Sequence, residues 1–239
     1  MIEIKNVTKK YKKRTYTRKK YMQFALDNVS AKIEDGKIIA IIGINGSGKT
    51  TLLKAIAGFV RLDDGIILID GKRVSIKTYK DLIFVPDFDT HFRNYTVNDM
   101  INFYKDFYPK WNDRKADYML EFFNIDKNEV VDYLSKGNIA KIKLVMSFAL
   151  DTKYILLDEP FNGIDIFKRE EFVSMMSKYM KEDQTIIITT HELSEIEHLV
   201  DDVLILNDGR LMANFTAEDL RTNEGKSIVD KMREVSIYE

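Results

Sequence analysis

The chain has 239 residues, enough for one large α/β domain or for a domain with an inserted subdomain. It contains no cysteine, which excludes disulfides, thiolate metal sites and a cysteine nucleophile, and which suits a reducing cytosol. The net charge is −1, there is no signal peptide, and no apolar stretch approaches the ~18–20 residues that span a bilayer, so we expect any membrane-crossing part on another polypeptide.

The first expected elements are an edge strand at residues 1–7 and its partner at residues 24–33. The segment between them is strongly basic, because residues 5–20 carry nine Lys or Arg and no acid. We interpret this run as a solvated loop between two strands. Binding to anionic lipid or to nucleic acid is the alternative, and we favour the loop.

A glycine-rich motif comes next. Residues 38–42 are an apolar run typical of a parallel strand buried on both faces, and residues 51–57 predict a helix. Residues 43–50 between them match the G-x-x-x-x-G-K-[ST] phosphate-binding loop in its required context. In such a loop, backbone N–H groups surround a polyphosphate at the positive end of a helix.

These residue types predict a nucleoside triphosphate site. Lys49 would meet the β- and γ-phosphates, and Thr50 would offer its hydroxyl to Mg²⁺. A glycine-rich turn that binds nothing is the alternative, and the match on both flanks argues against it. The predicted binding residues here are Gly43, Asn45, Gly46, Ser47, Gly48, Lys49, Thr50 and Thr51.

The middle of the chain changes character after two short strands, predicted at residues 66–69 and 82–85. Three helical segments rich in aromatic residues follow at 96–107, 114–123 and 128–133. They predict an inserted helical subdomain. A longer helix then has one apolar face, with Lys141 and Lys143 off that face.

Two acids follow the next buried strand, residues 154–157. Asp158 and Glu159 would lie at the carboxyl edge of the sheet, where ligands bind in open α/β sheets. Asp158 would hold Mg²⁺, directly or through water, and Glu159 would align a water with the γ-phosphate.

The remaining elements alternate in the same way. The expected order is a helix at 166–180, a strand at 185–189, a helix at 193–199 and a hairpin at 203–206 and 211–215. Thr216 would then start a short helix with a capping box. The tail after Asn223 carries no clear packing signal.

The spacing of these motifs resembles that of the ATP-binding cassette (ABC) ATPases over about residues 1–222. Asp158 follows Lys49 by 109 residues, and Leu-Ser-Lys-Gly-Asn at 134–138 is similar to the family's signature loop, usually Leu-Ser-Gly-Gly-Gln. Residues 161–165 are similar to its D-loop, and Thr190 with His191 to its switch histidine. Residues 7–11 resemble the segment that places an aromatic ring, here Tyr11, under the adenine. Tyr16 and Tyr21 are rivals for that position.

The resemblance implies a single α/β P-loop NTPase domain at 1–222, with an antiparallel β subdomain and an inserted α-helical subdomain. The RecA-like core would comprise about 1–86 and 150–215, and the helical subdomain about 88–149, followed by a tail at 223–239. The cofactors would be ATP and Mg²⁺.

In this family two cassettes pair head to tail. The resemblance implies that Ser135 and the backbone N–H of Gly137 close on the γ-phosphate of the other subunit's ATP. His191 would contact the γ-phosphate of its own site, and Asp165 would link the two sites. Catalysis would then rest on Glu159, His191 and Lys49. Leu134 and Ser135 as an ordinary helix start, and His191 as a capping histidine, are the structural alternatives.

Two positions depart from the family pattern. Lys136 replaces a glycine of the signature, and its ammonium would either help to bind the γ-phosphate or point to solvent. Asp87 stands where the family usually has glutamine; it is shorter and anionic, and it would reach Mg²⁺ through a water. Neither change removes the expected metal ligand, the base or the histidine, so we expect the chain to hydrolyse ATP.

The resemblance implies an ABC transporter subunit on the cytoplasmic face of the membrane, held there by separate permease subunits, without nucleic acid as a partner. A homodimer is expected over pairing with a paralogue. Phe88, Phe92 and Tyr95 would line a groove for the permease. Three stretches look like a Gram-positive exporter branch: Leu-Ser-Lys-Gly at 134–137, the acid after Val85 and Pro86, and Phe-Tyr-Pro-Lys-Trp at 107–111. That branch includes exporters of amphipathic peptides such as the phenol-soluble modulins. A soluble regulatory or ribosome-associated ABC ATPase is the alternative function.

Overall fold

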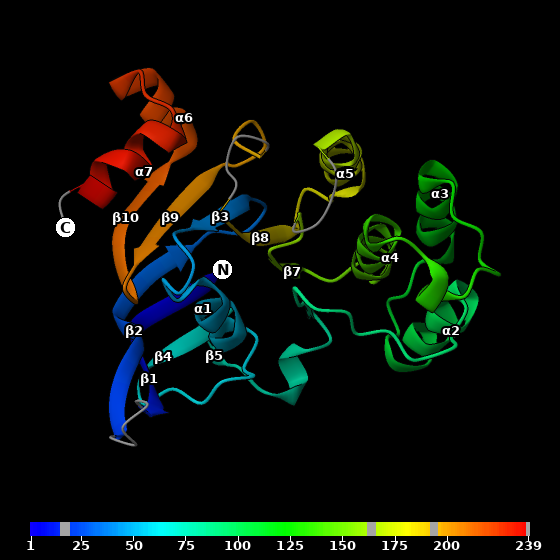
Figure 1. The fold of residues 1–239 in the computed structure, drawn as a ribbon, viewed down its shortest axis with the longest axis horizontal. Coiled ribbons are helices and arrows are strands. Elements are labelled where there is room, and N and C mark those ends of the chain that lie inside the picture. The colour runs from blue at the N-terminus through cyan, green and yellow to red at the C-terminus, as the bar shows by residue number, and fades with distance from the viewer. Residues whose placement is uncertain (15–19, 162–165, 192–195, 238–239) are drawn as a thin grey trace.

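The computed structural model describes residues 1–14, 20–161, 166–191 and 196–237. Two sheets form its framework (Figure 1). The larger has six strands in the order β10-β9-β3-β8-β7-β6, parallel except for the antiparallel pair β9 and β10. The smaller is antiparallel, in the order β2-β1-β4-β5. Their strands are β1 (Ile2–Arg14), β2 (Lys20–Ile33), β3 (Ile38–Ile42), β4 (Asp64–Ile69), β5 (Lys72–Arg73), β6 (Leu82–Val85), β7 (Tyr154–Asp158), β8 (Thr185–Thr190), β9 (Asp202–Asn207) and β10 (Arg210–Thr216).

Strand β3 is buried on both faces, as its unbroken apolar run predicts. Ile39 and Ile41 face a core that the six-stranded sheet shares with the smaller sheet and helix α1 (Lys49–Ile56). Ala40 and Ile42 face the opposite core, which the other helices cover. The phosphate loop therefore follows a strand that is fixed from both sides.

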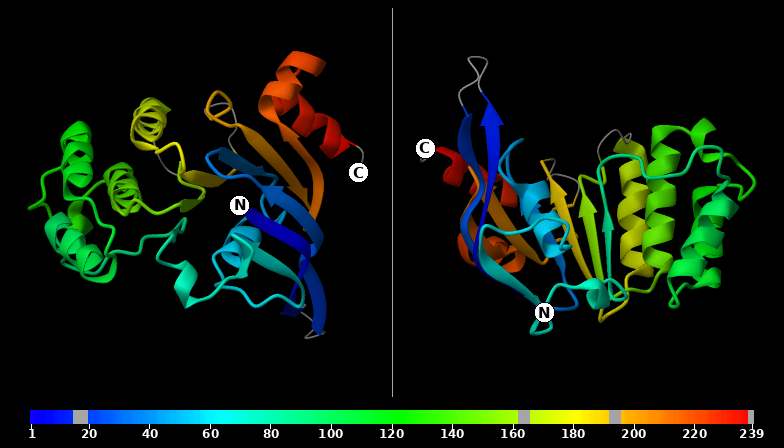
Figure 2. Two further views of the ribbon diagram at one scale, coloured as in Figure 1. Left: turned by 180° about the vertical axis from the view of Figure 1, so that it is seen from behind. Right: turned by 90° about the horizontal axis from the view of Figure 1, so that it is seen from below.

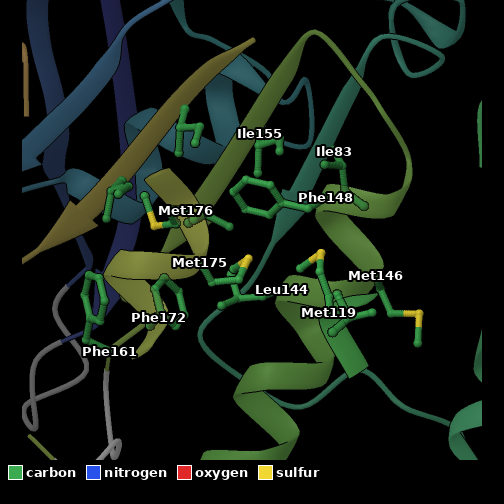
Figure 3. Close-up of a cluster of buried hydrophobic side chains, with 14 of the residues drawn as sticks. Ile83, Met119, Leu144, Met146, Phe148, Ile155, Phe161, Phe172, Met175 and Met176 are labelled. Atoms are coloured by element: carbon green, nitrogen blue, oxygen red, sulfur yellow. The ribbon is translucent and has the colours of Figure 1, made fainter. Parts of the chain in front are cut away.

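The second core lies under helices α4 (Lys136–Ala149) and α5 (Ile166–Tyr179). The ring of Phe148 lies beside Ile155 of β7, and Leu144 lies next to Met175 in the same cluster (Figure 3). Helices α2 (Val97–Phe107) and α3 (Asp113–Phe123) lie beyond α4, away from the sheet (Figures 1 and 2). A short 3₁₀ turn at Val131–Tyr133 precedes α4. Another 3₁₀ turn, at Ile76–Thr78, links β5 to β6.

Several sequence expectations for residues 1–149 were wrong in detail. Strand β1 lies between β2 and β4, so it is internal and not an edge strand. The basic segment is largely not a loop, because β1 runs to Arg14 and pairs with β2 up to Lys20. The expected helix at 128–133 shrinks to the 3₁₀ turn. Lys141 is buried, since its ammonium pairs with Glu171 of α5 and lies over the ring of Phe123.

The carboxyl-terminal expectations differ from the structure at three places. Residues 196–199 form a turn where part of a helix was expected, and the rest of that segment lies outside the described residues. Thr216 starts α6 (Ala217–Asp219) without a side-chain cap, so the capping box was wrong. After a π-helical turn at Leu220–Glu224, the tail forms α7 (Ile228–Ile237), whose first residue is fully buried. Within the described residues, no helix is long and apolar enough to cross a membrane.

Candidate functional site

The phosphate loop is built on glycines that no other residue could replace without a shift of the backbone. Gly48 has φ +107°, and a Cβ there would collide with the carbonyl oxygen of Ala25. A Cβ at Gly43 would collide with the carbonyl oxygen of Leu206. Gly46, in contrast, has open space around it, and its φ of +87° is the reason for glycine. The loop backbone is therefore held in one conformation at the start of α1.

Lys49 lies beneath this loop with its side chain 5% exposed. Its ammonium donates to the carbonyl oxygens of Gly43 at 2.8 Å and Ile44 at 3.3 Å. The same ammonium lies 3.3 Å from the Glu159 carboxylate, whose other oxygen is 2.8 Å from Nδ1 of His191. A cation, a carboxylate and an imidazole from three separate elements thus meet next to the loop.

Asp158 ends β7 and is buried. Its Oδ1 accepts hydrogen bonds from the hydroxyls of Thr50 at 2.8 Å and Thr189 at 2.7 Å. Burial raises the pKa of the Asp158 carboxyl, the two hydroxyls act against that change, and the negative charge of Asp87 adds to it. Its Oδ2 is buried without a hydrogen-bond partner, which leaves one oxygen free to bind a ligand.

Glu159 adopts a left-handed backbone conformation with φ +45°, uncommon for a residue with a side chain. Its backbone N–H is fixed by the carbonyl oxygen of Thr189 at 3.1 Å and the hydroxyl of Thr189 at 2.9 Å. Strand β8 thus stabilises, through Thr189, a strained residue whose carboxylate lies against Lys49 and His191.

A cavity of about 440 Å³ lies over the loop. The predicted residues that line it are Asn45, Gly46, Gly48, Lys49, Thr50, Thr51, Asp87, Glu159 and His191. Ser47 lies beneath the loop, 1% exposed. A hydrogen bond joins Thr50, which lines the cavity, to Asp158. The predicted phosphate-loop and carboxylate residues therefore converge at one place.

Gly43 and Ser47 of the loop do not line this cavity, and neither do three predicted binding residues from other parts of the chain. Tyr11 lies on the hairpin of β1 and β2, 42% exposed, with the Lys9 ammonium 5.3 Å from the centre of its ring. Ser135 and Gly137 are at the start of α4, where Ser135 caps the helix by accepting from the N–H of Asn138 at 3.2 Å. Lys136 next to them is exposed. Asp165 lies outside the described residues.

Two residues of the site escaped the sequence analysis. Ala25 of β2 lines the cavity, and its carbonyl oxygen lies against Gly48. The glycine at position 48 was the one sequence signal that another backbone segment comes this close. The Thr189 hydroxyl donates to the Asp158 carboxylate and accepts from the N–H of Glu159. The available sequence signal was a polar residue near the end of a buried strand, two residues before His191. Sequence spacing alone places neither beside the acids.

A family model described as ABC transporter matches residues 26–162, which include the loop and both acids. The chain belongs to the ABC transporter family.

Individual relatives within the ABC transporter family also match this chain over most of its length. The ABC transporter ATP-binding protein YtrB of Bacillus subtilis is 33% identical over 199 residues, covering 82% of this chain and 68% of that protein. The lantibiotic transport ATP-binding protein SrtF of Streptococcus pyogenes is 28% identical, covering 89% of both chains. A solved ATP-binding subunit of an ABC transporter superposes with a TM-score of 0.84 at 25% identity, covering 99% of each chain. This chain is therefore an ATP-binding subunit of an ABC transporter and an ATPase with the P-loop ABC fold.

Proposed function

We propose that this ABC subunit hydrolyses ATP in the cavity over residues 43–50 and that two copies close around the nucleotide to drive export. The observation that carries the proposal is the meeting of Lys49, Glu159 and His191 beside the phosphate loop. Lys49 would bind the β- and γ-phosphates, Glu159 would hold the attacking water and accept its proton, and His191 would keep Glu159 and the γ-phosphate aligned.

The donor set also fits Mg²⁺. Asp158 has a buried oxygen without a partner, and the Thr50 hydroxyl is 2.8 Å from its other oxygen. No group of three or more His, Asp or Glu side chains among the described residues forms a metal cluster. This agrees with Mg²⁺, which is bound through one or two carboxylates together with phosphate oxygens and water. When bound, the ion would neutralise charge on the phosphates, and Asp87 would reach it through a water.

We propose a homodimer in which each site is completed from the other subunit. The bacterial ABC transporter cassette MJ0796, which has this fold, has a dimeric structure. Ser135 and Gly137 start α4, a helix of 14 residues whose first N–H groups favour an anion. Because they lie outside their own cavity, they would close on the γ-phosphate of the partner's ATP. Tyr11 would stack on the adenine, as the exposed position of its ring allows.

The proposed cargo is a peptide or another amphipathic compound, and the direction is export. Support comes from the stretches that resemble the Gram-positive exporter branch and from SrtF, whose name describes transport of a lantibiotic. Residues 88–149 would act as a helical subdomain that passes closure to a permease at the membrane. Phe88 and Phe92, 58% and 48% exposed, would contact that permease.

ATP-dependent dimerisation of the subunit gives the sharpest test of this function. Glu159→Gln should bind ATP–Mg²⁺ but lose about 10²–10⁴ in turnover, because general-base help is gone. Because the bound ATP is not hydrolysed, it should trap a dimer of the variant, which light scattering would detect. Adding Ser135→Arg should abolish that dimer while ATP binding to the same chain's phosphate loop remains, because a long cation blocks closure.

The control is the same pair of proteins without nucleotide, both of which should be monomeric. A dimer of the double variant with ATP would contradict the role of Ser135. Wild-type turnover in Glu159→Gln would contradict the role of Glu159. ATP-dependent closure without any co-purifying membrane protein would instead favour a soluble regulatory ABC ATPase.

A further inference from the structure

Lys143 of α4 holds the short segment that contains Asp87. Its ammonium donates to the carbonyl oxygen of Phe88 at 2.6 Å and to that of Pro86 at 3.3 Å, and it lies 3.4 Å from the carboxylate of Asp89. An ammonium has three donors, and these three acceptors lie on both sides of Asp87. The Lys143 side chain is 15% exposed and that of Asp89 is 52% exposed, so a mostly covered ammonium binds a segment at the surface.

The held segment has no regular secondary structure of its own. After β6 ends at Val85, residues 86–95 cross from the sheet to α2. Asp132 holds the far part of this crossing, through the N–H of Asn94 at 2.6 Å and the ring of His91 at 3.0 Å. Next to Asp87, the carbonyl oxygens of Pro86 and Phe88 accept hydrogen bonds from the side chain of Lys143. This ammonium therefore helps to fix the position of Asp87, together with the pairing of Val85 with Leu157 at the end of β6.

Asp87 lies where two cavities meet. It lines the cavity over the phosphate loop together with Lys49 and Glu159. It also lines a second cavity of about 310 Å³, whose wall includes Lys136 and Lys143. Its negative charge is close enough to Asp158 to help raise the pKa of that carboxyl. A small displacement of residues 86–89 would therefore alter the charge beside the site.

The helix that carries Lys143 also begins at Ser135. Residues 144–149 of α4 are fully or almost fully buried, so the helix is fixed as a rigid body against the second core. Ser135 at the start of α4 and Lys143 within it are about 12 Å apart along the helix axis, at 1.5 Å per residue. A movement of α4 would carry both together.

We infer that Lys143 is a positioning residue of the ATPase: it sets Asp87 beside the phosphate loop and ties that setting to the helix that starts at Ser135. The inference rests on the proposed nucleotide site and adds a residue to which the sequence motifs assign no role.

The test is a double-mutant cycle on turnover. Lys143→Met keeps the length of the side chain and removes its donors. We expect it to lower kcat about tenfold while the dissociation constant for ATP stays within about twofold, because a misplaced group costs rate and the phosphate loop is untouched. In an Asp87→Ala background, the same substitution should change kcat less than about twofold, since the group it positions is gone.

Lys141→Met is the matched control, because Lys141 is a buried lysine on the same helix that contacts Glu171 and Phe123 instead. Its effect on kcat should be the same with and without Asp87. If Lys143→Met does not fold, Lys143→Gln keeps one donor and enters the same cycle.

Equal effects of Lys143→Met in both backgrounds, or wild-type kcat in Lys143→Met, would overturn the inference. So would wild-type kcat in Asp87→Ala. Failure of the wild-type protein to bind ATP in an equilibrium titration would instead overturn the proposed function, so the two failures are distinguishable.

Discussion

Asp70 lies at the turn between β4 and β5, among groups that favour its charged form. Burial acts to raise the pKa of its carboxyl, but hydrogen bonds from Lys153 at 2.8 Å, from the amino group of Met1 at 2.7 Å and from the Tyr154 hydroxyl at 2.9 Å outweigh it. The pKa falls to about 2. Asp35 shares the same partners. This cluster joins the smaller sheet to β7.

The lowered pKa predicts how acid affects stability. A carboxyl whose pKa is near 3.9 in the unfolded chain and about 2 in the folded chain stabilises the fold above about pH 4, and that contribution is lost as the pH falls towards 2. Asp70→Asn should therefore melt at a lower temperature than wild type at pH 6. The difference between the two proteins should shrink between pH 4 and pH 2.5. A difference that stays constant with pH would contradict the assignment.

At the scale of elements, α7 shows how burial gives a short helix its place. Ile228 is fully buried, and its N–H donates to the carboxylate of Glu197 at 2.7 Å. Ser227 and Asp230 cap the start of the helix through reciprocal hydrogen bonds of 3.1 Å. Met232 packs against the same core as a half-buried side chain. The helix is thus anchored at its first turn.

Truncating that anchor should destabilise the protein. Ile228→Ala should lower the free energy of unfolding by about 2–5 kcal/mol, through lost apolar burial and a residual cavity. Arg233→Ala, on the exposed side of the same helix, should change it by less than about 0.5 kcal/mol. Urea unfolding followed by circular dichroism measures both. Equal stability of the two variants would mean that α7 does not anchor to the core.

The sequence predicted the elements whose signals are local. The buried strands around residues 38–42 and 154–157 are unbroken apolar runs, and the phosphate loop has a fixed pattern of glycines. Elements that depend on distant partners were missed. Helix α7 is short, and its place follows from the burial of Ile228 and the hydrogen bond of its N–H to Glu197. The same holds for Lys143, whose role depends on carbonyl groups in a segment that no pattern of side chains reveals.

At the scale of the whole molecule, exposed aromatic rings gather on the helical side of the structure. Phe92 is 48% exposed and contacts the rings of Tyr95 and Phe103 at 5.0 Å between centres. Phe88 and Phe107 are exposed near it along the chain. An exposed aromatic group of this kind favours a protein partner.

This surface predicts the outcome of purification from membranes. A tagged Phe92→Asp subunit should retain about a tenth or less of the permease that wild type retains, because burying an unpaired charge is costly. Its ATP turnover in solution should match wild type. Ile76→Asp, at a residue 86% exposed on the turn between β5 and β6, should co-purify normally. Normal recovery with Phe92→Asp would place the permease contact elsewhere.

The strand order of the larger sheet affects how the protein folds during its synthesis. Strand β3 forms its hydrogen bonds with β8 and β9, so Ile38 pairs with Ile186 and Ile39 with Asp202. During synthesis the amino-terminal residues leave the ribosome first, and pairing across such a separation in sequence is slow. Helix α1 and the smaller sheet can cover Ile39 and Ile41 early, but the opposite face of β3, with Ile38, Ala40 and Ile42, stays uncovered until most of the chain has emerged. The loop that follows them gains its fixed shape only then, so nucleotide can stabilise the finished fold but cannot guide its early steps.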